Sequence, residues 1–458
     1  MKVLRQLICA VLICGLSCVI TGCGKASVES SESTTEITTE TLADRENEIE
    51  GKIVVWVESS ALMNTKYAEY KKEFEAKYPG TEVEYKVVSN FEIAGYNSIL
   101  NGDAGDVVMI PNRMTEDEIK EYFIPFGTTE DISKKYREQY IHRMDYDGVV
   151  YGLPEYVMPQ GIVYNKRVLE YAGVVELPTT PDEFIDMLTA IKVKNQGIIP
   201  FYIDDTALDK WQNHVWGSVS GNADYHYNGI VLENDPFAKD SPNYVVHKLM
   251  YDIVYDRLCQ SKKLDYTHAR QLLNRGDIAC MLVDFEDVAK IQDAGSNPDD
   301  IGYMPFPYNI DGKQYATATY GYCYGIPLDS LNKSTAEAFV KFMIKDSGYA
   351  SSEGAISLKK KTARPTLLSD FEGVELVFDN PATTENEGLY QQLCEKSGLQ
   401  LEDGKQKREI IEVAMKARPG QAVDEEEDTS TEEEEEVILP KDFDEIMEQW
   451  YQKWNAVK

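Results

Sequence analysis

The chain has 458 residues, 43% of them hydrophobic, and a formal net charge of −33 at pH 7. This length suggests two or three domains, and the apolar content is sufficient for packed cores. A surface this acidic repels nucleic-acid phosphates and anionic lipid headgroups, so we expect no nucleic-acid partner.

The N-terminus is typical of an exported lipoprotein. An apolar run over residues 7–20 follows Lys2 and Arg5, and it has the length of a signal-peptide h-region. Cys23 comes just after this run and resembles a lipobox cysteine, which is acylated with diacylglycerol after cleavage. We therefore expect residues 1–22 to be removed and Cys23 to anchor the protein on the extracellular face of the cytoplasmic membrane. The alternative is an ordinary signal peptide with a chance cysteine.

Residues 23–50 are predicted to be a disordered acidic spacer behind this anchor. They are rich in Ser, Thr and Glu and have no apolar periodicity. Such a segment cannot bury enough surface to offset the entropy cost of ordering it. A spacer of this kind would hold a tethered domain clear of the lipid.

The first folded segment reads as a βαβαβ unit. A continuous apolar run at 53–57 predicts a buried parallel strand, and aromatic residues at steps of three and four predict a helix over 63–78. A strand over 83–88, a short helix over 91–101 and a strand over 106–110 follow. This order predicts an α/β fold with parallel strands.

Ligands of such sheets bind beyond the carboxyl ends of the strands, where Glu58 and Asn112 stand here. The chain has neither a GxGxxG motif nor a Walker-type Gly-Lys-Ser/Thr motif, so we expect no nucleotide and no other cofactor.

Later segments add further α/β elements. Thr180 and Glu183 form a capping box that begins a helix, and a strand is predicted over 278–283. A helix over 336–344 and a final amphipathic helix over 443–454 follow, with Trp residues on one face of the last helix.

Neither the cysteines nor the acidic stretch predicts a metal site. The four cysteines outside the signal and lipobox are far apart and form no CxxC or Cys/His cluster: Cys259, Cys280, Cys323 and Cys394. We expect buried apolar thiols, although a disulfide between two of them stays open. Residues 421–437 are predicted to be a disordered acidic loop. A calcium-binding loop is the alternative, but ten acids without interleaved Gly or Asn turns do not preorganise a cation cage.

From Tyr151 onward the sequence resembles the family 1 extracellular solute-binding proteins, the sugar-binding lipoproteins of ABC importers. The matching motifs occur in the family's order and spacing: Tyr151-Gly152-Leu153-Pro154, Tyr164-Asn165-Lys166, Ala172-Gly173 and Pro178-Thr179. Further similar stretches are 101–108, 274–281, 301–307 and 336–354, so that the resemblance covers residues 51–458.

The resemblance implies two α/β lobes of the periplasmic-binding-protein-like (class II) fold, joined by a three-strand hinge. Lobe 1 would comprise 51–153 plus 305–345, and lobe 2 would comprise 154–304 plus 346–458. The implied protein is a monomer without catalytic residues. It would capture a solute by hinge closure and deliver it to membrane permease subunits.

Two departures from the family pattern leave the solute open. The family usually has a small residue followed by a sugar-stacking Trp where this chain has Asp284 and Phe285. A Gly-Gly pair that is frequent in the family is replaced by Tyr320-Gly321-Tyr322.

A sugar site combines carboxylates or amides for the hydroxyl groups with flat aromatic rings for the C–H faces. The candidates for such a site are Glu58, Asn112, Glu155, Tyr156, Trp211, Trp216, Asp284, Phe285, Tyr320 and Tyr322. For each of them, core packing or a satisfied surface position is the alternative interpretation.

Three other functions stay open at this point. A peptide, polyamine or other cationic solute would suit the negative charge of the chain and of Glu58, Glu155 and Asp284. A secreted glycoside hydrolase would need a pair of carboxylates at one site. A ligand-sensing receptor for a sensor kinase would use the same binding physics with a different partner.

Overall fold

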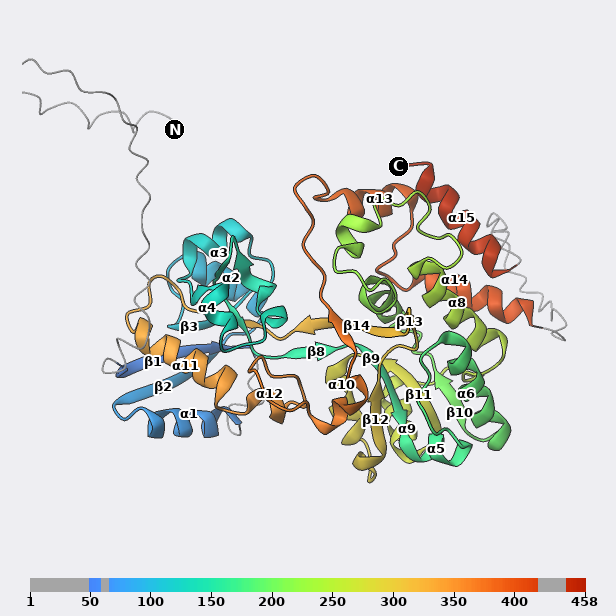
Figure 1. Ribbon diagram of the computed structural model, residues 1–458, viewed down its shortest axis with the longest axis horizontal. Helices are drawn as coiled ribbons and strands as arrows, with labels where there is room; N and C mark the ends of the chain where they lie inside the picture. Colours follow the sequence, from blue (N-terminus) through green and yellow to red (C-terminus); the bar gives the residue numbers. More distant parts are fainter. Residues whose placement is uncertain (1–48, 59–65, 419–441) are drawn as a thin grey trace, which may run out of the picture. The chain divides into compact units, whose positions relative to one another are not determined.

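The computed structural model describes residues 49–58, 66–418 and 442–458, which belong to one unit, Arg45–Lys458. The predictions for the signal peptide, for Cys23 and for the acidic loop 421–437 lie outside the described residues. So does the spacer prediction, apart from its last two residues. Two main sheets, each with its own helices, make up the described chain (Figure 1).

The first sheet contains the predicted βαβαβ unit. The central strand β1 is parallel to β2 and to β3, as the continuous apolar run predicts. On the other side of β3, β15 runs antiparallel to β3, and β7 runs antiparallel to β15. The strand order is β2 (Thr81–Val87), β1 (Gly51–Val57), β3 (Val107–Ile110), β15 (Cys323–Gly325) and β7 (Leu153–Pro154).

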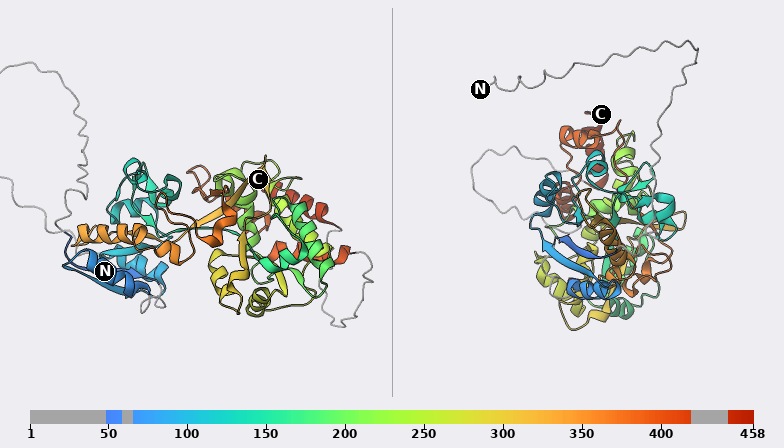
Figure 2. Two further views of the ribbon diagram at one scale, coloured as in Figure 1. Left: turned by 60° about the horizontal axis from the view of Figure 1, so that its bottom comes forward. Right: turned by 90° about the vertical axis from the view of Figure 1, so that its left-hand side faces the viewer.

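The helices α1 and α11 cover this sheet (Figure 2). Their aromatic side chains pack together. Phe74 of α1 meets Phe339 of α11 edge to face, with ring centroids 5.2 Å apart. The elements of this part are α1 (Lys66–Lys77), α2 (Phe91–Leu100), α3 (Glu116–Tyr122), α4 (Thr129–Ser133), α11 (Lys333–Lys345), α12 (Tyr349–Ser352) and a small sheet of β4 (Gly127–Thr128), β6 (Val149–Val150) and β5 (Asp145–Tyr146).

The second sheet is buried on both faces. Strand β11 is parallel to β10, whereas β9 lies antiparallel to both β11 and β12. The order is β10 (Ile199–Tyr202), β11 (Ile278–Val283), β9 (Gly161–Asn165) and β12 (Ile301–Met304). Its helices are α5 (Lys166–Ala172), α6 (Pro181–Lys194), α8 (Pro242–Tyr255), α9 (Tyr266–Arg275) and α10 (Phe285–Gln292).

The predicted helix start at Thr180 and the tryptophan face of the last helix are confirmed. The capping box is only half formed, because the Glu183 carboxylate accepts its hydrogen bond from the Thr179 N–H at 2.8 Å rather than from Thr180. Thr180 caps α6 by accepting a hydrogen bond from the Glu183 N–H at 3.2 Å. The last helix α15 buries Trp450 and Trp454 against Phe237. The remaining helices are α7 (Lys210–Asn213), α13 (Leu389–Ser397), α14 (Lys405–Ala417) and α15 (Phe443–Asn455), and π-helical turns cover 214–219 and 225–229.

The chain crosses three times between the two main sheets (Figure 1): twice through strands that pair with each other, and once after α12, where Ile356 pairs with Val157. In these strands β8 (Val157–Pro159) is antiparallel to β14 (Lys313–Tyr320), which is parallel to β16 (Glu375–Val377) and also pairs with β13 (Asn309–Ile310). The Thr317 Oγ1 of β14 accepts hydrogen bonds from the N–H groups of Gly217 and Ser218, at 3.1 and 2.9 Å. This linkage ties the middle of β14 to the part of the chain that carries the second sheet.

These connections give the two-lobe periplasmic-binding-protein-like (class II) α/β fold with a three-strand hinge that the resemblance implies. The buried apolar side chains form two clusters. One cluster underlies the first sheet and reaches Phe285 and Tyr303, and the other lies among the helices of the second sheet. The detailed division into 51–153 plus 305–345 and 154–304 plus 346–458 stays a prediction.

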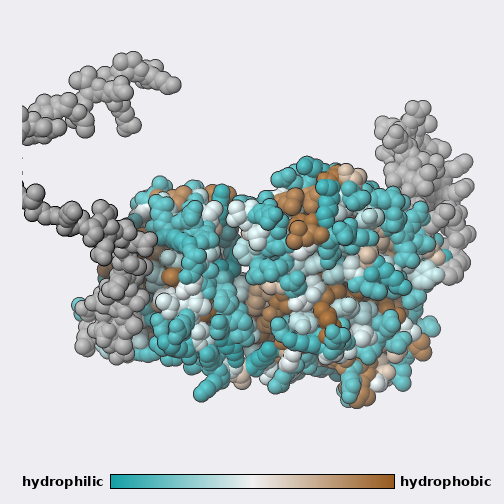
Figure 3. Space-filling model, turned by 45° about the horizontal axis from the view of Figure 1, so that its top comes forward, coloured by the Kyte–Doolittle hydropathy of each residue, from teal (hydrophilic) through white to brown (hydrophobic). Residues whose placement is uncertain are grey.

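In the part of the chain that the structure describes, no helix is long and apolar enough to span a membrane. Cys259, Cys280, Cys323 and Cys394 are free thiols, and the last three are buried. The face drawn in Figure 3 is mainly hydrophilic, with its hydrophobic residues in separate small groups.

Candidate binding site at the hinge

A cavity of about 390 Å³ lies where the first sheet meets the hinge strands. Side chains from the ends of β1 and β3, from α1, α10 and α12, and from the hinge strands enclose it. The residues that line it are Glu58, Tyr67, Met109, Asn112, Glu155, Tyr156, Met158, Glu286, Tyr320, Gly321, Tyr322, Tyr349 and Glu353.

The cavity brings together six of the ten predicted site residues: Glu58, Asn112, Glu155, Tyr156, Tyr320 and Tyr322. Two physical reasons explain this. The parallel strands β1 and β3 end at the same edge of the sheet, which places Glu58 near Asn112. Hydrogen bonds between main-chain groups, from Glu155 N to Tyr322 O and from Gly321 N to Tyr156 O, both 3.0 Å, hold the hinge residues side by side.

The other four predicted residues lie outside this lining. Trp211 packs near Phe201, with ring centroids 5.8 Å apart, in the core of the second lobe. Trp216 is buried in the same core and stacks on the ring of His226 at 4.1 Å and 5°.

Asp284 and Phe285 lie at the start of α10, but the contacts of their side chains are with residues outside the cavity lining. Asp284 forms an ion pair with Lys210 at 2.8 Å, and Phe285 is buried beside Tyr303 with ring centroids 5.8 Å apart. The neighbouring Glu286 is the residue of this turn that lines the cavity.

Sequence reasoning missed Tyr67, Glu286, Tyr349 and Glu353 as site residues. Tyr67 belongs to the aromatic stripe of α1, and a helical stripe indicates core packing rather than a binding site. Tyr349 and Glu353 lie in and just after α12, a helix too short to give a periodic signal.

Tyrosine rings form one wall of the cavity. Tyr349 lies at the centre of this wall, 6.0 Å from the ring of Tyr67 and 5.7 Å from the ring of Tyr156, measured between centroids. Tyr322 meets Phe91 edge to face at 5.7 Å. Burial, reinforced by Glu92 and Glu58, raises the pKa of Tyr322 to about 12, so its hydroxyl is a hydrogen-bond donor at neutral pH.

Glu155 is the most deeply buried carboxyl group of the cavity, with 4% of its surface exposed. Its Oε1 has no hydrogen-bond partner among the described residues. Burial raises the pKa of Glu155 to about 8. The hydroxyl of Tyr324 opposes this rise, while Glu353 and Glu58 add to it.

The other polar lining residues have partners or lie at the rim. Glu353 forms an ion pair with Lys66, the first residue of α1. The Asn112 side chain accepts a hydrogen bond from Arg143 at 3.2 Å and donates one to Glu92 at 3.3 Å. Burial raises the pKa of Glu286, with a contribution from Asp284.

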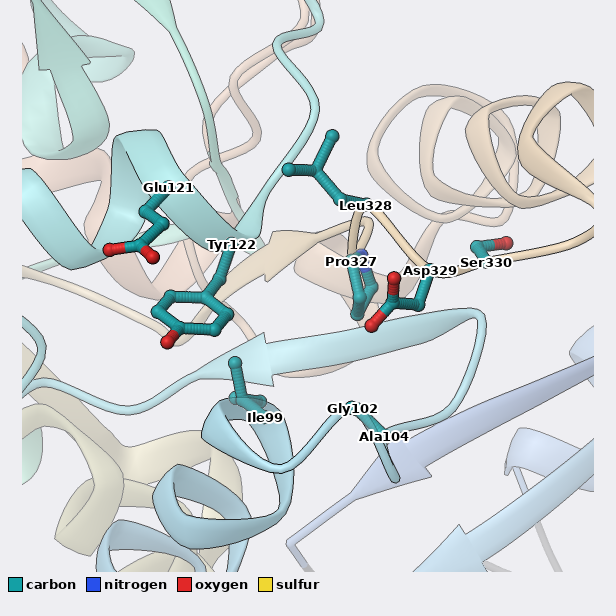
Figure 4. Close-up of a pocket in the computed structure, with 9 residues that line it drawn as sticks. All are labelled: Ile99, Gly102, Ala104, Glu121, Tyr122, Pro327, Leu328, Asp329 and Ser330. Carbon is teal, nitrogen blue, oxygen red and sulfur yellow. The ribbon is translucent and has the colours of Figure 1, made fainter. Parts of the chain in front are cut away.

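Other cavities lie near the hinge and on the first lobe. A cavity of about 520 Å³ includes Tyr320, which stacks on Phe378 with ring centroids 4.2 Å apart. A smaller one of about 170 Å³ lies on the first lobe between Ile99, Tyr122 and Pro327 (Figure 4). The small cavity contains none of the predicted site residues.

The hinge cavity is suited to binding and holds no recognisable metal centre. Flat rings and carboxyl groups are what a polyhydroxylated ligand requires. Among the residues that the structure describes, no group of three or more His, Cys, Asp or Glu side chains is arranged to hold a metal ion.

Two lobes with a polar, aromatic cavity at their hinge define a ligand-binding protein of the solute-binding class. The sequence profile described as bacterial extracellular solute-binding protein matches residues 59–350. The chain belongs to this family, which confirms the resemblance found in the sequence.

Two solved structures and one curated relative are similar to this chain. The binding protein BlMnBP1 of an ABC transporter from Bifidobacterium animalis subsp. lactis, in complex with mannobiose, is 31% identical with a TM-score of 0.66. The alignment covers 91% of this chain and 96% of that one. The manno-oligosaccharide-specific BlMnBP2 from the same organism, in complex with mannotriose, is 30% identical with a TM-score of 0.65 and the same coverage.

The curated relative is the diacetylchitobiose binding protein DasA of Streptomyces coelicolor, 27% identical over 253 residues, or 53% of this chain. The matched region spans 52%, about half, of the length of that relative. The family and these three relatives are binding proteins rather than enzymes.

Proposed function

We propose that this protein is the solute-capturing subunit of an ABC importer and that its solute is an oligosaccharide. The observation that carries the proposal is the hinge cavity, which combines five tyrosines with four glutamates and one asparagine. Such a lining offers ring faces for C–H groups and acceptors for hydroxyl groups. The ABC transporter and the sugar ligands of the relatives support the same function.

The proposed mechanism is selection of a closed state by the ligand. Lining residues come from the first lobe, from the hinge and, through Glu286 of α10, from the second lobe. A ligand that touches all three gains contacts when the lobes close, so it shifts the equilibrium toward the closed form. The closed form would then deliver the solute to the membrane permease. This function needs no catalytic residue, and we propose that the protein is not an enzyme.

The lipid anchor completes the proposal. The sequence before the fold supports acylation of Cys23 after removal of residues 1–22. The mature protein would then be a monomer tethered to the extracellular face of the cytoplasmic membrane, where its permease partner lies.

Calorimetric titration with a panel of manno-, gluco-, galacto- and chito-oligosaccharides tests the function. At least one member should bind saturably, and a ligand at 100 times its Kd should stabilise the protein by about 2.7 kcal/mol. Small-angle scattering should show compaction on binding. A panel in which nothing binds would contradict the carbohydrate assignment, and release of reducing sugar from any member would contradict the absence of catalysis.

A further inference from the structure

The hinge cavity carries an excess of negative charge. Four of its lining residues are glutamates, and none of the described lining residues is Lys, Arg or His. The chain therefore supplies little positive charge at this place.

Among the cations near the lining, Arg143 is hydrogen-bonded to the Asn112 side chain at 3.2 Å, and the others form ion pairs with acids. Lys66 forms its ion pair with Glu353. On the other side, Lys210 pairs with Asp284 at 2.8 Å and with Asp287 at 3.3 Å. Lys290 pairs with Asp287 as well. These pairs compensate Glu353 and the acids of α10 other than Glu286.

Glu155 is a second and independent sign, because burial without a facing positive charge keeps this carboxyl group protonated in the ligand-free protein, and an ammonium group beside it would favour its ionised form. It is almost completely buried, it lines the cavity, and its Oε1 lacks a hydrogen-bond partner among the described residues. The Tyr324 hydroxyl donates a hydrogen bond to this carboxyl group, but Oε1 has lost its hydration without gaining a partner, which is costly. The groups that face it are acids and phenols, namely Glu58, Glu353, Tyr67, Tyr324 and Tyr349.

The tyrosine wall suits the same type of ligand group. The faces of aromatic rings attract cations, and the attraction grows when the cation is desolvated. Tyr156 and Tyr349 lie in this wall next to Glu155 in the lining. A protonated amine would donate hydrogen bonds to carboxylates and place its charge against the rings.

We propose, building on the oligosaccharide function above, that the solute is an amino sugar whose protonated amine binds beside Glu155. The amine supplies the cation that the lining lacks, while the remaining hydroxyl groups use the other carboxyl and amide groups of the cavity. A neutral sugar of the same size could donate a hydroxyl hydrogen bond to Glu155 but would bring no positive charge.

Titration calorimetry at pH 6.5 with three probes tests this proposal: a β-1,4-linked glucosamine disaccharide, its N-acetylated counterpart, and mannobiose. The amino sugar should bind at least about ten-fold more tightly than either neutral probe. Glu155→Gln keeps the size of the side chain and should remove at least about ten-fold of the amino-sugar affinity, with little effect on the neutral probes. Glu170→Gln, an exposed acid of α5, is the matched control and should change nothing.

The outcomes separate this proposal from the function on which it rests. Tighter binding of a neutral probe would overturn the amino-sugar proposal and leave the oligosaccharide function standing. Equal amino-sugar affinity in the Glu155→Gln variant would overturn the role of Glu155, and a cooperative melting transition would show that the variant is folded. If none of the three probes bound and the wider sugar panel also failed, both proposals would fall.

Discussion

Tyr156 and Tyr349 meet with ring centroids 5.7 Å apart and ring planes at 56°. Tyr156 directly precedes the hinge strand β8, and Tyr349 begins the short helix α12. Both line the cavity, so this contact fixes the shape of the tyrosine wall against which a ligand would lie.

Replacement of Tyr156 by Ala should weaken sugar binding. The change removes a ring face and leaves Tyr349 without its neighbour, which should cost about 1 kcal/mol or more of binding free energy. Titration calorimetry on the best ligand of the oligosaccharide panel measures the loss. Tyr171→Ala is the control, because Tyr171 is 60% exposed on α5. Equal affinities for the two variants would contradict a role of Tyr156 in the site.

Gly321→Ala should disturb the cavity through the same ring. A methyl group at this position would lie 2.9 Å from Cε2 of Tyr156, closer than carbon atoms approach without displacement. The ring would have to shift into the cavity, and affinity should fall while the melting temperature changes little. Gly197→Ala meets only the end of the Asn195 side chain and is the control. Unchanged affinity would mean that the ring adapts at no cost.

The stability of the ligand-free protein should decrease from pH 5 to pH 8 because of Glu155. Burial raises the pKa of this carboxyl to about 8, so the folded protein keeps a proton that the unfolded chain releases near pH 4.5. The stabilisation is present below the unfolded pKa and is lost as pH rises through the folded pKa. Denaturant titrations at several pH values should show this slope. Glu155→Gln should flatten it, and parallel curves for the variant and the wild type would contradict the raised pKa.

His226 should titrate above its ordinary value. Burial alone would lower the pKa of His226, but Asp379 at 2.7 Å and Glu402 at 2.8 Å outweigh burial and raise it. The resulting stabilisation is present below the unfolded pKa and is lost as pH rises through the folded pKa. Nuclear magnetic resonance titration of the ring measures the pKa directly. Asp379→Asn should lower it, and a value below 6.5 in the wild type would refute the pairing.

Cys23→Ala should release the protein into the medium. The acyl chains attached to a lipobox cysteine supply most of the membrane affinity, and a surface as acidic as this one adds none. Immunoblots of membrane and medium fractions from cells that express each form test the expectation. Membrane retention of the variant would show that another segment anchors the protein.

The fold was predictable because its signals are local. Three signals each predict one element within a few residues: the apolar run of β1, the Thr180 cap and the tryptophan face of α15. The structure contains all three elements. The order of strands and helices then leaves few topologies.

The site was predictable only in part, because strand ends are local features and core packing is not. Glu58 and Asn112 follow strands whose common edge the topology fixes. Trp211 and Trp216 lie in a polar stretch without apolar periodicity, yet α7 and the π-helical turn that follows it place them in the second core. Tyr67 shows the opposite error, because it belongs to a helical stripe typical of core packing and yet lines the cavity. Tyr349 was missed because α12 is too short to give a periodic signal.

The segment from the middle of β14 to β15 is held by a different lobe at each end. Thr317 is bonded to the main chain of Gly217 and Ser218, whereas Cys323 of β15 pairs with Ile110 in the first sheet. Rotation of one lobe against the other must therefore bend this connection within residues 318–322. That stretch includes Tyr320, Gly321 and Tyr322, which line the cavity. A bound solute would therefore contact the residues that bend, and its size and shape would determine how far the lobes can rotate.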